Sequence, residues 1–600
     1  MMANSELMRK AVIPLVFSEL FPEERISTLN DALIFRLRQL NRTQTIRLCA
    51  HINTLISDPW QSRIGLNHQE PLLRLLFDNR TLRRVQKFTR KHPTQKNGWT
   101  GEITIFHREQ LLDLIRLATI HCPDTAKYKS PLQSNRSKKT FVQAALLVSE
   151  LLMDRTYAHV NLDADAETKR ESTLEALRHS ARYNSSATDP IRAFGRGKLM
   201  FFEFLPQVFP DFGKNFQEHT GISLEDYFAC LFLVITRYLQ IDPRHTAFAQ
   251  HIISLDELGQ QMPHLSNTFR QYLVLESYTS EKLQIAFQTV AGSEYNLKPL
   301  RQRPILQLSE NQAITLDPAF HTEKAMVGPL FAVPTLIGRL LGDFGKAFEK
   351  YVQAILQKMY PQADSGNILF LNENLGDKKQ TLGEIDAGLI ESDQLLLFEM
   401  KAVWIRDTGI VQPDHEDYLT TLHEYTKGAH QLASVINNLI RGKAQIEHHD
   451  LQTTKRIYPV LVVYDSSLSV PGYTWFFAKE FHDALNPDGL LTDSHMIMTK
   501  GQWEVAPLTI MPIDVLENLE ASIQNFTLTD LLKDYFSFRD AQFQGEADTL
   551  TLSEFISLSG YQQKITTAGS TIIKKALEIF EDAVKKLVPE DKQAELLSDL

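Results

Sequence analysis

Two short segments carry ionisable residues at spacings that could support chemistry. Residues 383–390 have the sequence GEIDAGLI, and residues 398–401 have the sequence FEMK after an apolar run. Side chains alternate between the two faces of a β-strand, so Glu399 and Lys401 share one face of the second segment. If the segments pair as a hairpin, Asp386 comes to that same face. Burying these charges beside apolar residues is costly unless they pair or bind a cation.

The chemistry that fits this set is hydrolysis of a phosphodiester bond. Two carboxylates make a hard oxygen site suited to Mg²⁺ or Mn²⁺. A neighbouring ammonium can position a water and favour its deprotonation, and a divalent ion can polarise a phosphoryl oxygen. A purely structural interpretation makes Asp386 and Lys401 an ordinary cross-strand ion pair, with Glu399 on an exposed edge. The completeness of the arrangement favours the catalytic interpretation.

These segments resemble the core of the PD-(D/E)XK nuclease superfamily, which includes many restriction endonucleases and repair nucleases. The resemblance covers about residues 340–520. It implies that Asp386 and Glu399 ligate the metal ion, that the backbone carbonyl of Met400 is a further ligand, and that Lys401 organises the attacking water. Ile385 stands where the motif often has proline, a departure that is common in this loose motif.

The flanking sequence extends the resemblance. Glu349, in the segment GKAFE, takes the place of an acidic residue that the first helix of the superfamily often holds near the metal. Gln431, in the segment HEYTKGAHQL, would point at the active site or the scissile phosphate. Surface helix positions are the alternative for both. Val435 stands where members similar to the RecB nuclease domain have tyrosine, which argues against that close assignment. Glu384 shares a strand face with Asp386, so it is either a further metal-site residue or a solvated one.

Hydrophobic periodicity predicts the elements that must position these residues. Beyond residue 336 we expect a helix over 345–360, a strand over 368–371, a strand pair over 380–390 and 394–401, a helix over 422–440 and strands over 456–464 and 474–477. This order of helix, three strands, helix and strand implies an α/β layer. The resemblance makes it a restriction-endonuclease-like core with a central mixed sheet flanked by helices.

The remainder of the chain is predicted to be mainly helical. Apolar residues recur at helical spacing in residues 32–55, 70–90, 108–120, 140–153 and 228–239. Residues 255–278 hold two helical stretches, and residues 304–308 and 313–316 form a hairpin. The last hundred residues are helical, most clearly over 571–587. We therefore predict a multidomain α+β protein with four regions, 1–240, 241–335, 336–520 and 521–600.

Charge is distributed unevenly along the 600 residues. The whole chain has a net charge of -10, yet residues 1–200 hold 31 Lys and Arg against 20 Asp and Glu. No acidic residue lies between Asp78 and Glu102, and the segment that follows Asp78 is strongly basic. Such a segment could neutralise several phosphates, with a solvated helix face as the alternative. The predicted nucleic-acid contacts are Arg80, Arg83, Arg84, Lys87, Arg90 and Lys91.

Several classes of protein are excluded by composition. Hydrophobic residues make up 43% and charged residues 23%, which is typical of a globular protein. Three dispersed cysteines argue against a disulfide framework or a structural zinc site, and they fit a reducing cytosol. The sequence has no run of about 20 apolar residues, so it predicts no membrane span. We expect a cytoplasmic protein that does not associate with membranes.

The expected function is that of a Mg²⁺- or Mn²⁺-dependent DNA endonuclease. RNA is the second candidate substrate. Two further hypotheses stay open: a nucleic-acid-binding or regulatory protein whose nuclease fold is catalytically silent, and an effector that acts on a protein. Nucleases joined to regions without an assigned role are frequent in bacterial defence against phage, and analogy places the chain there. The expected partners are DNA, a second copy of the chain, and a partner protein or trigger that acts through the N-terminal region.

Overall fold

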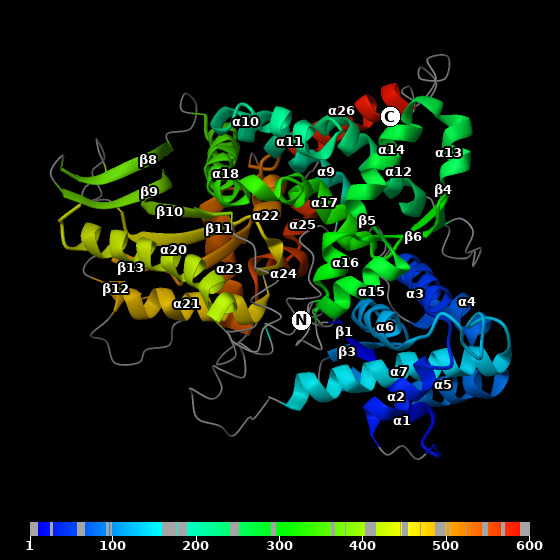
Figure 1. The fold of residues 1–600 in the computed structure, drawn as a ribbon. Coiled ribbons are helices and arrows are strands. Elements are labelled where there is room, and N and C mark those ends of the chain that lie inside the picture. The colour runs from blue at the N-terminus through cyan, green and yellow to red at the C-terminus, as the bar shows by residue number, and fades with distance from the viewer. Residues whose placement is uncertain are drawn as a thin grey trace. The chain divides into compact units, whose positions relative to one another are not determined.

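Figure 1 shows the computed structural model of the chain, a mixed α+β structure dominated by helices. The described residues are 10–24, 28–56, 66–91, 95–96, 99–158, 177, 189–239, 251–289, 296–361, 367–377, 380–402, 416–444, 446, 454–468, 470–486, 498–500, 503–523, 525–542, 550–565 and 570–587. They fall into two compact units. Unit 1 comprises Met1–Ala193, Phe216–Ala332 and Ile579–Leu600, and unit 2 comprises Phe194–Asn215 and Val333–Glu578. The predicted division into four regions is finer and stays a prediction.

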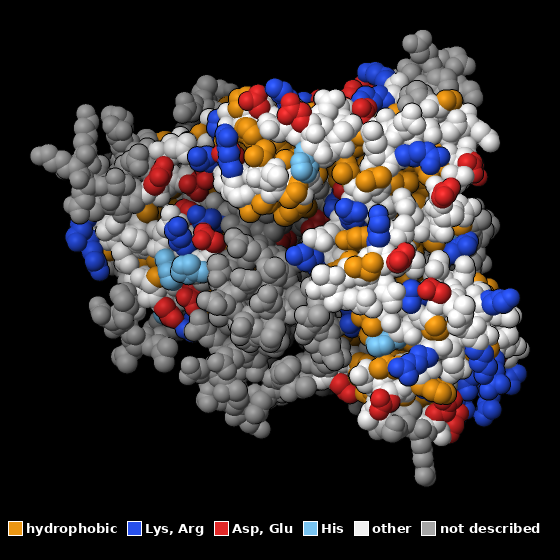
Figure 2. Space-filling model, viewed as in Figure 1, with side chains coloured by type: hydrophobic (Ala, Val, Ile, Leu, Met, Phe, Trp, Pro, Cys, Tyr) orange, Lys and Arg blue, Asp and Glu red, His pale blue; other side chains and the backbone are white. Residues whose placement is uncertain are grey.

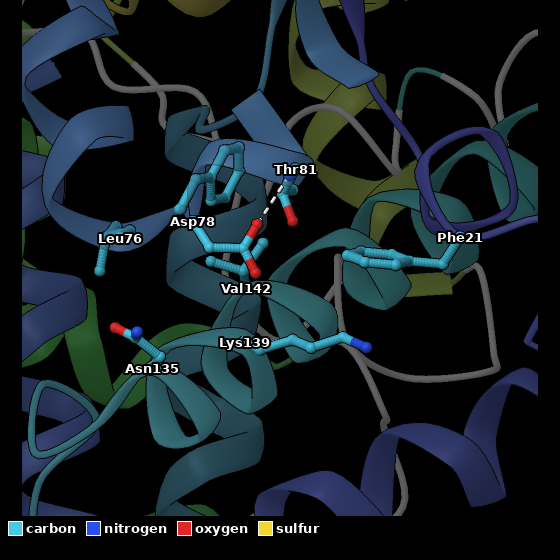
Figure 3. Close-up of a pocket in the computed structure, with 8 residues that line it drawn as sticks. Phe21, Leu76, Asp78, Thr81, Asn135, Lys139 and Val142 are labelled. Atoms are coloured by element: carbon cyan, nitrogen blue, oxygen red, sulfur yellow. Dashed lines mark hydrogen bonds between the residues drawn. The ribbon is translucent and has the colours of Figure 1, made fainter. Parts of the chain in front are cut away.

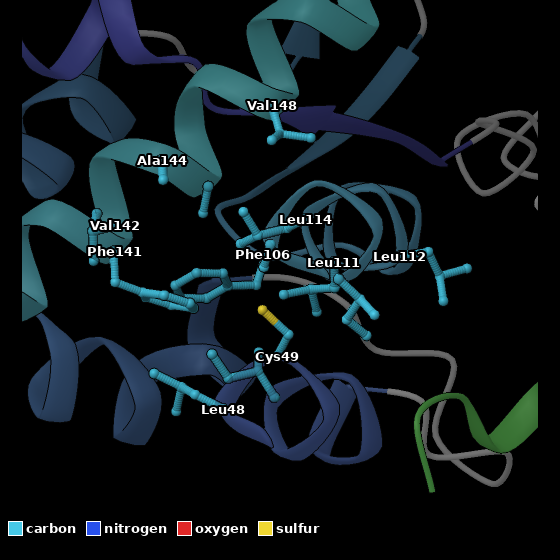
Figure 4. Close-up of a cluster of buried hydrophobic side chains, with 14 of the residues drawn as sticks. Leu48, Cys49, Phe106, Leu111, Leu112, Leu114, Phe141, Val142, Ala144 and Val148 are labelled. Carbon is cyan, nitrogen blue, oxygen red and sulfur yellow. The ribbon is translucent and has the colours of Figure 1, made fainter. Parts of the chain in front are cut away.

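The N-terminal part of unit 1 is helical, as predicted. Its helices are α1 (Phe17–Leu20), α2 (Leu29–Leu37), α3 (Arg42–Ile56), α4 (Leu66–Leu76), α5 (Asn79–Lys91), α6 (Arg108–His121) and α7 (Asn135–Ala158). Figure 4 shows how Cys49 of α3, Phe106 and Phe141 of α7 meet in its apolar core. A small sheet that the sequence did not predict joins β1 (Lys10–Pro14), β3 (Trp99–Thr104) and β2 (Gln95–Lys96) in that order.

Two of the predicted N-terminal helices are each divided into two. The side-chain oxygen of Asn41 accepts the backbone N–H of Gln44 at 3.0 Å, at the start of α3. The carboxylate of Asp78 accepts the backbone N–H of Thr81 at 2.7 Å, at the start of α5. Both residues act as helix caps, which satisfy first-turn N–H groups and so start a new helix where apolar spacing alone predicts continuity.

The rest of unit 1 combines buried helices with a second sheet. The helices are α11 (Phe212–Thr220, which begins in unit 2), α12 (Leu224–Leu239), α13 (Leu255–Gln261), α14 (Ser266–Glu276), α15 (Ser280–Thr289), α16 (Lys298–Gln302) and α17 (Pro318–Phe331). The sheet has the order β4 (Ile252–Ser254), β7 (Gln312–Thr315), β6 (Ile305–Ser309) and β5 (Ser277–Thr279). β6 and β7 pair antiparallel, which confirms the predicted hairpin.

Unit 2 is built on a seven-stranded mixed sheet. Its chain order runs α18 (Ile337–Met359), β8 (Ile368–Asp377), β9 (Gln380–Glu391), β10 (Gln394–Lys401), α20 (Glu416–Ile440) and β11 (Arg456–Val463), which confirms the predicted order of elements. The strand order is β12 (Met498–Lys500), β13 (Trp503–Val505), β11, β10, β9 and β8, and β14 (Thr509–Pro512) also pairs with β11. β8, β9 and β10 are antiparallel, whereas β10 and β11 are parallel.

The predicted strand over residues 474–477 is wrong. These residues lie in α21 (Pro471–Leu485), and Pro471 occupies the first helical turn, where its missing N–H costs nothing. Tyr473, Phe476, Phe477 and Phe481 are buried at helical spacing, and the rings of Tyr473 and Phe477 stack with centroids 6.2 Å apart. The short strands β12, β13 and β14 were not predicted because each has only three or four residues.

The remaining helices are α9 (Pro190–Lys198), α10 (Leu205–Val208), α22 (Ile513–Leu519), α23 (Leu528–Gln542), α24 (Leu552–Leu558), α25 (Tyr561–Lys564) and α26 (Thr571–Leu587). The C-terminal region is therefore helical, as predicted. Within the described part of the chain, no single helix has the length and apolar composition to cross a membrane. The consecutive segments Pro318–Phe331 and Pro334–Met359 meet those criteria only as a pair.

Candidate active site

The candidate site lies in unit 2, where the pairing of β9 and β10 ends. The last antiparallel pair is Ala387 with Phe398, so Asp386 and Glu399 are the next residues on the two strands. The backbone N–H of Met400 donates to Oδ2 of Asp386 at 2.7 Å. A carboxylate of β9 thus accepts a hydrogen bond from a backbone N–H of β10. This contact fixes the side chain of Asp386 against the second strand.

Lys401 connects strand β10 to helix α20. Its Nζ donates to Oε1 of Glu399 at 2.6 Å and to Oε1 of Gln431, on α20, at 3.3 Å. The Glu399 side chain is only 4% exposed and that of Lys401 is 19% exposed. Glu399 therefore does not lie on an exposed edge, as the purely structural interpretation of the sequence required.

The site is an acidic cluster around one ammonium. Burial, together with the charge of Asp386, raises the pKa of Glu399 to about 7, and Lys401 opposes this shift. Burial also raises the pKa of Glu349, on α18, to about 7, together with the charges of Asp386 and Glu384. Burial likewise raises the pKa of Asp386. These shifts mean that the ionised carboxylates are destabilised, first by burial and then by one another, which a bound cation would relieve.

The ammonium of Lys401 stays charged in this setting. Burial acts to lower its pKa, but the charges of Glu399, Asp386 and Glu349 outweigh burial, so its pKa is raised. Glu384 is exposed on β9, next to the cluster rather than inside it. All five predicted catalytic residues, Glu349, Asp386, Glu399, Lys401 and Gln431, thus belong to one cluster of hydrogen bonds and mutual charge interactions.

Two residues that support the site were missed by sequence reasoning. Nε2 of Gln353, on α18, donates to the backbone oxygen of Asp386 at 2.9 Å and to Oδ1 of Asn372, on β8, at 2.8 Å. Asn372 has a positive φ of 52°, an uncommon conformation that asparagine tolerates. The signal that could have found Gln353 is its position four residues after Glu349, on the same helix face.

Gly428 is the second missed residue. A Cβ at this position of α20 would lie 3.1 Å from Cε of Lys401 and 3.2 Å from Cγ of Glu399. The absence of a side chain therefore lets the helix backbone approach the two charged side chains. A glycine three residues before Gln431, inside an otherwise regular helix, is the signal in the sequence.

The residues present fit a hard divalent cation. Asp386 and Glu399 supply carboxylate oxygens, and their raised pKa values show that both negative charges lack full compensation. Among the described residues, no group of three or more His, Cys, Asp or Glu side chains is arranged to hold a metal ion. Mg²⁺ is commonly bound through one or two carboxylates and several waters, so a two-carboxylate site suits it. The role of the Met400 carbonyl stays a prediction.

The predicted nucleic-acid contacts lie on α5, in unit 1. Arg80, Arg83, Arg84 and Lys87 line an open hollow of about 440 Å³ together with Asn79. Figure 2 shows Lys and Arg side chains gathered at the lower right of the view, where Figure 1 places α4 and α5. The side chains of Arg90 and Lys91 lie outside the described residues.

A small pocket next to α5 does not show the features of a ligand site. Its lining includes Asp78, Thr81, Asn135 and Lys139 (Figure 3). The Asp78 carboxylate accepts the N–H of Thr81, and Nζ of Lys139 donates to Glu24 at 2.9 Å. Its charged groups are therefore already engaged within the protein.

Comparison with protein-family models, with curated proteins and with solved structures finds no match to this chain. The function of the chain must therefore be inferred from the chemistry of the cluster and from the elements that hold it.

Proposed function

We propose that this chain is a metal-dependent nuclease that hydrolyses phosphodiester bonds, with DNA as the preferred substrate. The observation that carries the proposal is the convergence of Asp386, Glu399 and Lys401 at the end of the β9–β10 ladder. Two carboxylates beside one ammonium can hold a divalent cation and position a water for attack on a phosphate.

The order of elements around the cluster supports the same proposal. The chain order is α18, three antiparallel strands, α20 and the parallel strand β11. The resemblance to PD-(D/E)XK nucleases implies this order. In this arrangement the first helix contributes Glu349, the second and third strands contribute Asp386 and Glu399, and the second helix contributes Gln431. We therefore assign a restriction-endonuclease-like core to unit 2 as part of the proposal.

Asp386 and Glu399, with the Met400 carbonyl, would hold Mg²⁺ or Mn²⁺. When bound, the ion would polarise a phosphoryl oxygen and offset the negative charge that develops during displacement. The contact from the Met400 N–H keeps one oxygen of Asp386 engaged at 2.7 Å, so its other oxygen is the one available for the metal ion. Gln353 fixes the backbone at Asp386 and so positions this ligand.

Lys401 would position the attacking water. An ammonium has three N–H donors, and here two of them are used by Glu399 and Gln431. The third can donate to a water and stabilise it as it loses a proton, for which the Glu349 carboxylate, with its pKa near 7, is a suitable acceptor. The water oxygen bonds to phosphorus as its proton passes to Glu349, one ester P–O bond breaks, and solvent water donates a proton to the departing alkoxide.

Cleavage assays on supercoiled plasmid, single-stranded DNA and single-stranded RNA test this proposal. Each substrate is incubated with Mg²⁺, Mn²⁺ or EDTA. We expect metal-dependent cutting that falls by at least about 100-fold in Asp386→Asn and in Lys401→Met, because each loses a group required at the reacting phosphate. The matched control is Asp393→Asn with Lys455→Met, which removes an exposed ion pair at the far end of the same hairpin.

The outcomes separate the competing functions. Cutting of RNA alone would identify an RNA nuclease. Cutting that persists in both site variants would remove this cluster from consideration. Nucleic-acid binding without cutting under any metal condition would favour a catalytically silent nuclease fold. A role in defence against phage stays a prediction by analogy.

A further inference from the structure

The outer face of α5 carries a row of cations. α5 packs inward through Thr81 and Val85, which are buried, whereas Arg80, Arg83 and Lys87 are exposed. Residues three and four positions apart lie on the same side of a helix, so these three cations form a continuous stripe. They line one hollow, whose other described lining residues are Asn79 and Arg84.

Arg84 differs from the other three cations. Its guanidinium pairs with Oε1 of Glu23 at 2.7 Å and donates to the backbone oxygen of Leu20 at 2.9 Å. These contacts connect α5 to the end of α1. No described acidic side chain forms an ion pair with Arg80, Arg83 or Lys87. Arg80 is attracted to Glu23 at longer range, so the excess of positive charge is greatest at Arg83 and Lys87.

We propose that Arg80, Arg83 and Lys87 form a docking surface for the phosphate backbone of nucleic acid, with Arg84, paired with Glu23, at its edge. Glu23 limits the affinity of this surface because it neutralises Arg84 at its edge. The surface belongs to unit 1 and the candidate active site to unit 2, so this is a second nucleic-acid contact in the same chain. The choice of nucleic acid as the polyanion rests on the proposed nuclease function.

The lining of the hollow favours phosphates over an acidic protein. Its described residues supply four cationic side chains and one asparagine. Protein interfaces are usually anchored by aromatic or apolar side chains in well-packed pockets, and no described lining residue is of that kind. Arginine forks match phosphate oxygens, and rows of Lys and Arg replace the counterions of a nucleic acid. An acidic protein is therefore the outcome to be excluded by the test.

Salt-dependent binding of labelled nucleic acid to the full chain tests this inference. Fluorescence anisotropy is measured in EDTA, so that no metal-dependent cleavage intervenes, with single-stranded DNA, duplex DNA, single-stranded RNA and polyglutamate as probes. In the triple variant Arg80→Gln, Arg83→Gln and Lys87→Gln, the log–log salt slope should fall by about 2 to 3 because three phosphate contacts are lost. Glutamine favours helix, so α5 should persist.

A matched control removes the same charges elsewhere in unit 1. The variant Arg38→Gln, Arg270→Gln and Lys282→Gln also loses two arginines and one lysine from exposed positions. It should keep the slope of the unmodified protein. Glu23→Gln should tighten binding because it releases Arg84 from its ion pair.

The inference fails if the α5 variant and the control variant change the slope equally, or if no probe binds at low salt. It also fails if polyglutamate binds as tightly as nucleic acid and loses affinity in the α5 variant, since the surface would then accept an acidic protein. Because binding is measured without cleavage, its failure is distinct from failure of the nuclease proposal.

Discussion

At the scale of single residues, Gly428 controls how closely α20 approaches the candidate site. A methyl group there would lie 3.1 Å from the Lys401 side chain, 3.2 Å from that of Glu399 and 3.1 Å from Cδ1 of Leu461. Gly428→Ala should therefore lower the proposed nuclease activity by about 10- to 100-fold, because small displacements of reacting groups are costly. Alanine is the better helix former by about 1 kcal/mol, so the expected loss is not one of folding.

Gly342→Ala on α18 is the control for that substitution. No atom lies within 4 Å of a Cβ built at this position. It should raise the free energy of unfolding by up to about 1 kcal/mol and leave activity unchanged. Equal activity in the two alanine variants would show that the close approach of α20 is unimportant to the site.

The candidate site could be predicted only in part from the sequence. Asp386, Glu399 and Lys401 follow from strand alternation, since the period of two fixes which side chains share a face. Gln353 and Gly428 act through contacts between elements far apart in sequence, and such contacts depend on how the helices pack on the sheet. The pairing of Arg84 with Glu23 likewise depends on packing between α1 and α5.

At the scale of elements, a buried ion pair connects α9 to the core of unit 2. The Arg196 guanidinium is 1% exposed, contacts Asp514, and donates to both oxygens of Glu517 at 2.7 and 2.6 Å. The hydroxyl of Tyr351, on α18, donates to the same Glu517 at 2.8 Å. α9, α18 and α22 therefore share one polar network.

Removing Arg196 should be strongly destabilising. Arg196→Met leaves Glu517 buried without its counter-ion, which costs about 3–5 kcal/mol. In the double variant with Glu517→Gln the cost should be smaller, since no buried charge remains. Urea unfolding measures the free energy of unfolding of both variants. The control is Arg339→Met, because the Arg339 side chain pairs with Asp343 while it is 63% exposed. A similar cost for Arg196→Met and Arg339→Met would contradict the role given to this network.

Helices and strands were predicted correctly where the periodic pattern spans many residues. They were predicted wrongly where single capping residues or tertiary packing determine the structure. α18, α20 and the β9–β10 hairpin each have enough residues for their period to be read from the sequence. The divisions before α3 and α5 depend on single capping residues, Asn41 and Asp78. The segment 474–477 was assigned as a strand because of its aromatic residues, although tertiary packing places those residues on α21.

At the scale of the whole molecule, the two units should respond to acid in opposite directions. Burial lowers the pKa of His51 to about 2, of His251 to about 4 and of His321 to about 3, all in unit 1. The usual histidine value is 6.5, so below that pH the unfolded state binds protons that the folded state does not. Unit 1 therefore loses stability as the pH falls from about 6.5, by up to about 1.4 kcal/mol per pH unit for each histidine.

The acidic cluster of unit 2 makes the stability of this unit change with pH in the opposite direction. Folding raises the pKa of Glu349 and Glu399 from 4.5 to about 7, so the folded state binds more protons between these values. Unit 2 therefore gains stability as the pH falls from about 7 towards 4.5. Hydrogen exchange of the full chain in EDTA at pH 7 and pH 5, corrected for the intrinsic exchange rate, resolves the two units separately. Glu349→Gln with Glu399→Gln should reduce the gain in unit 2 and leave unit 1 unaffected, whereas a parallel loss in both units would contradict the prediction.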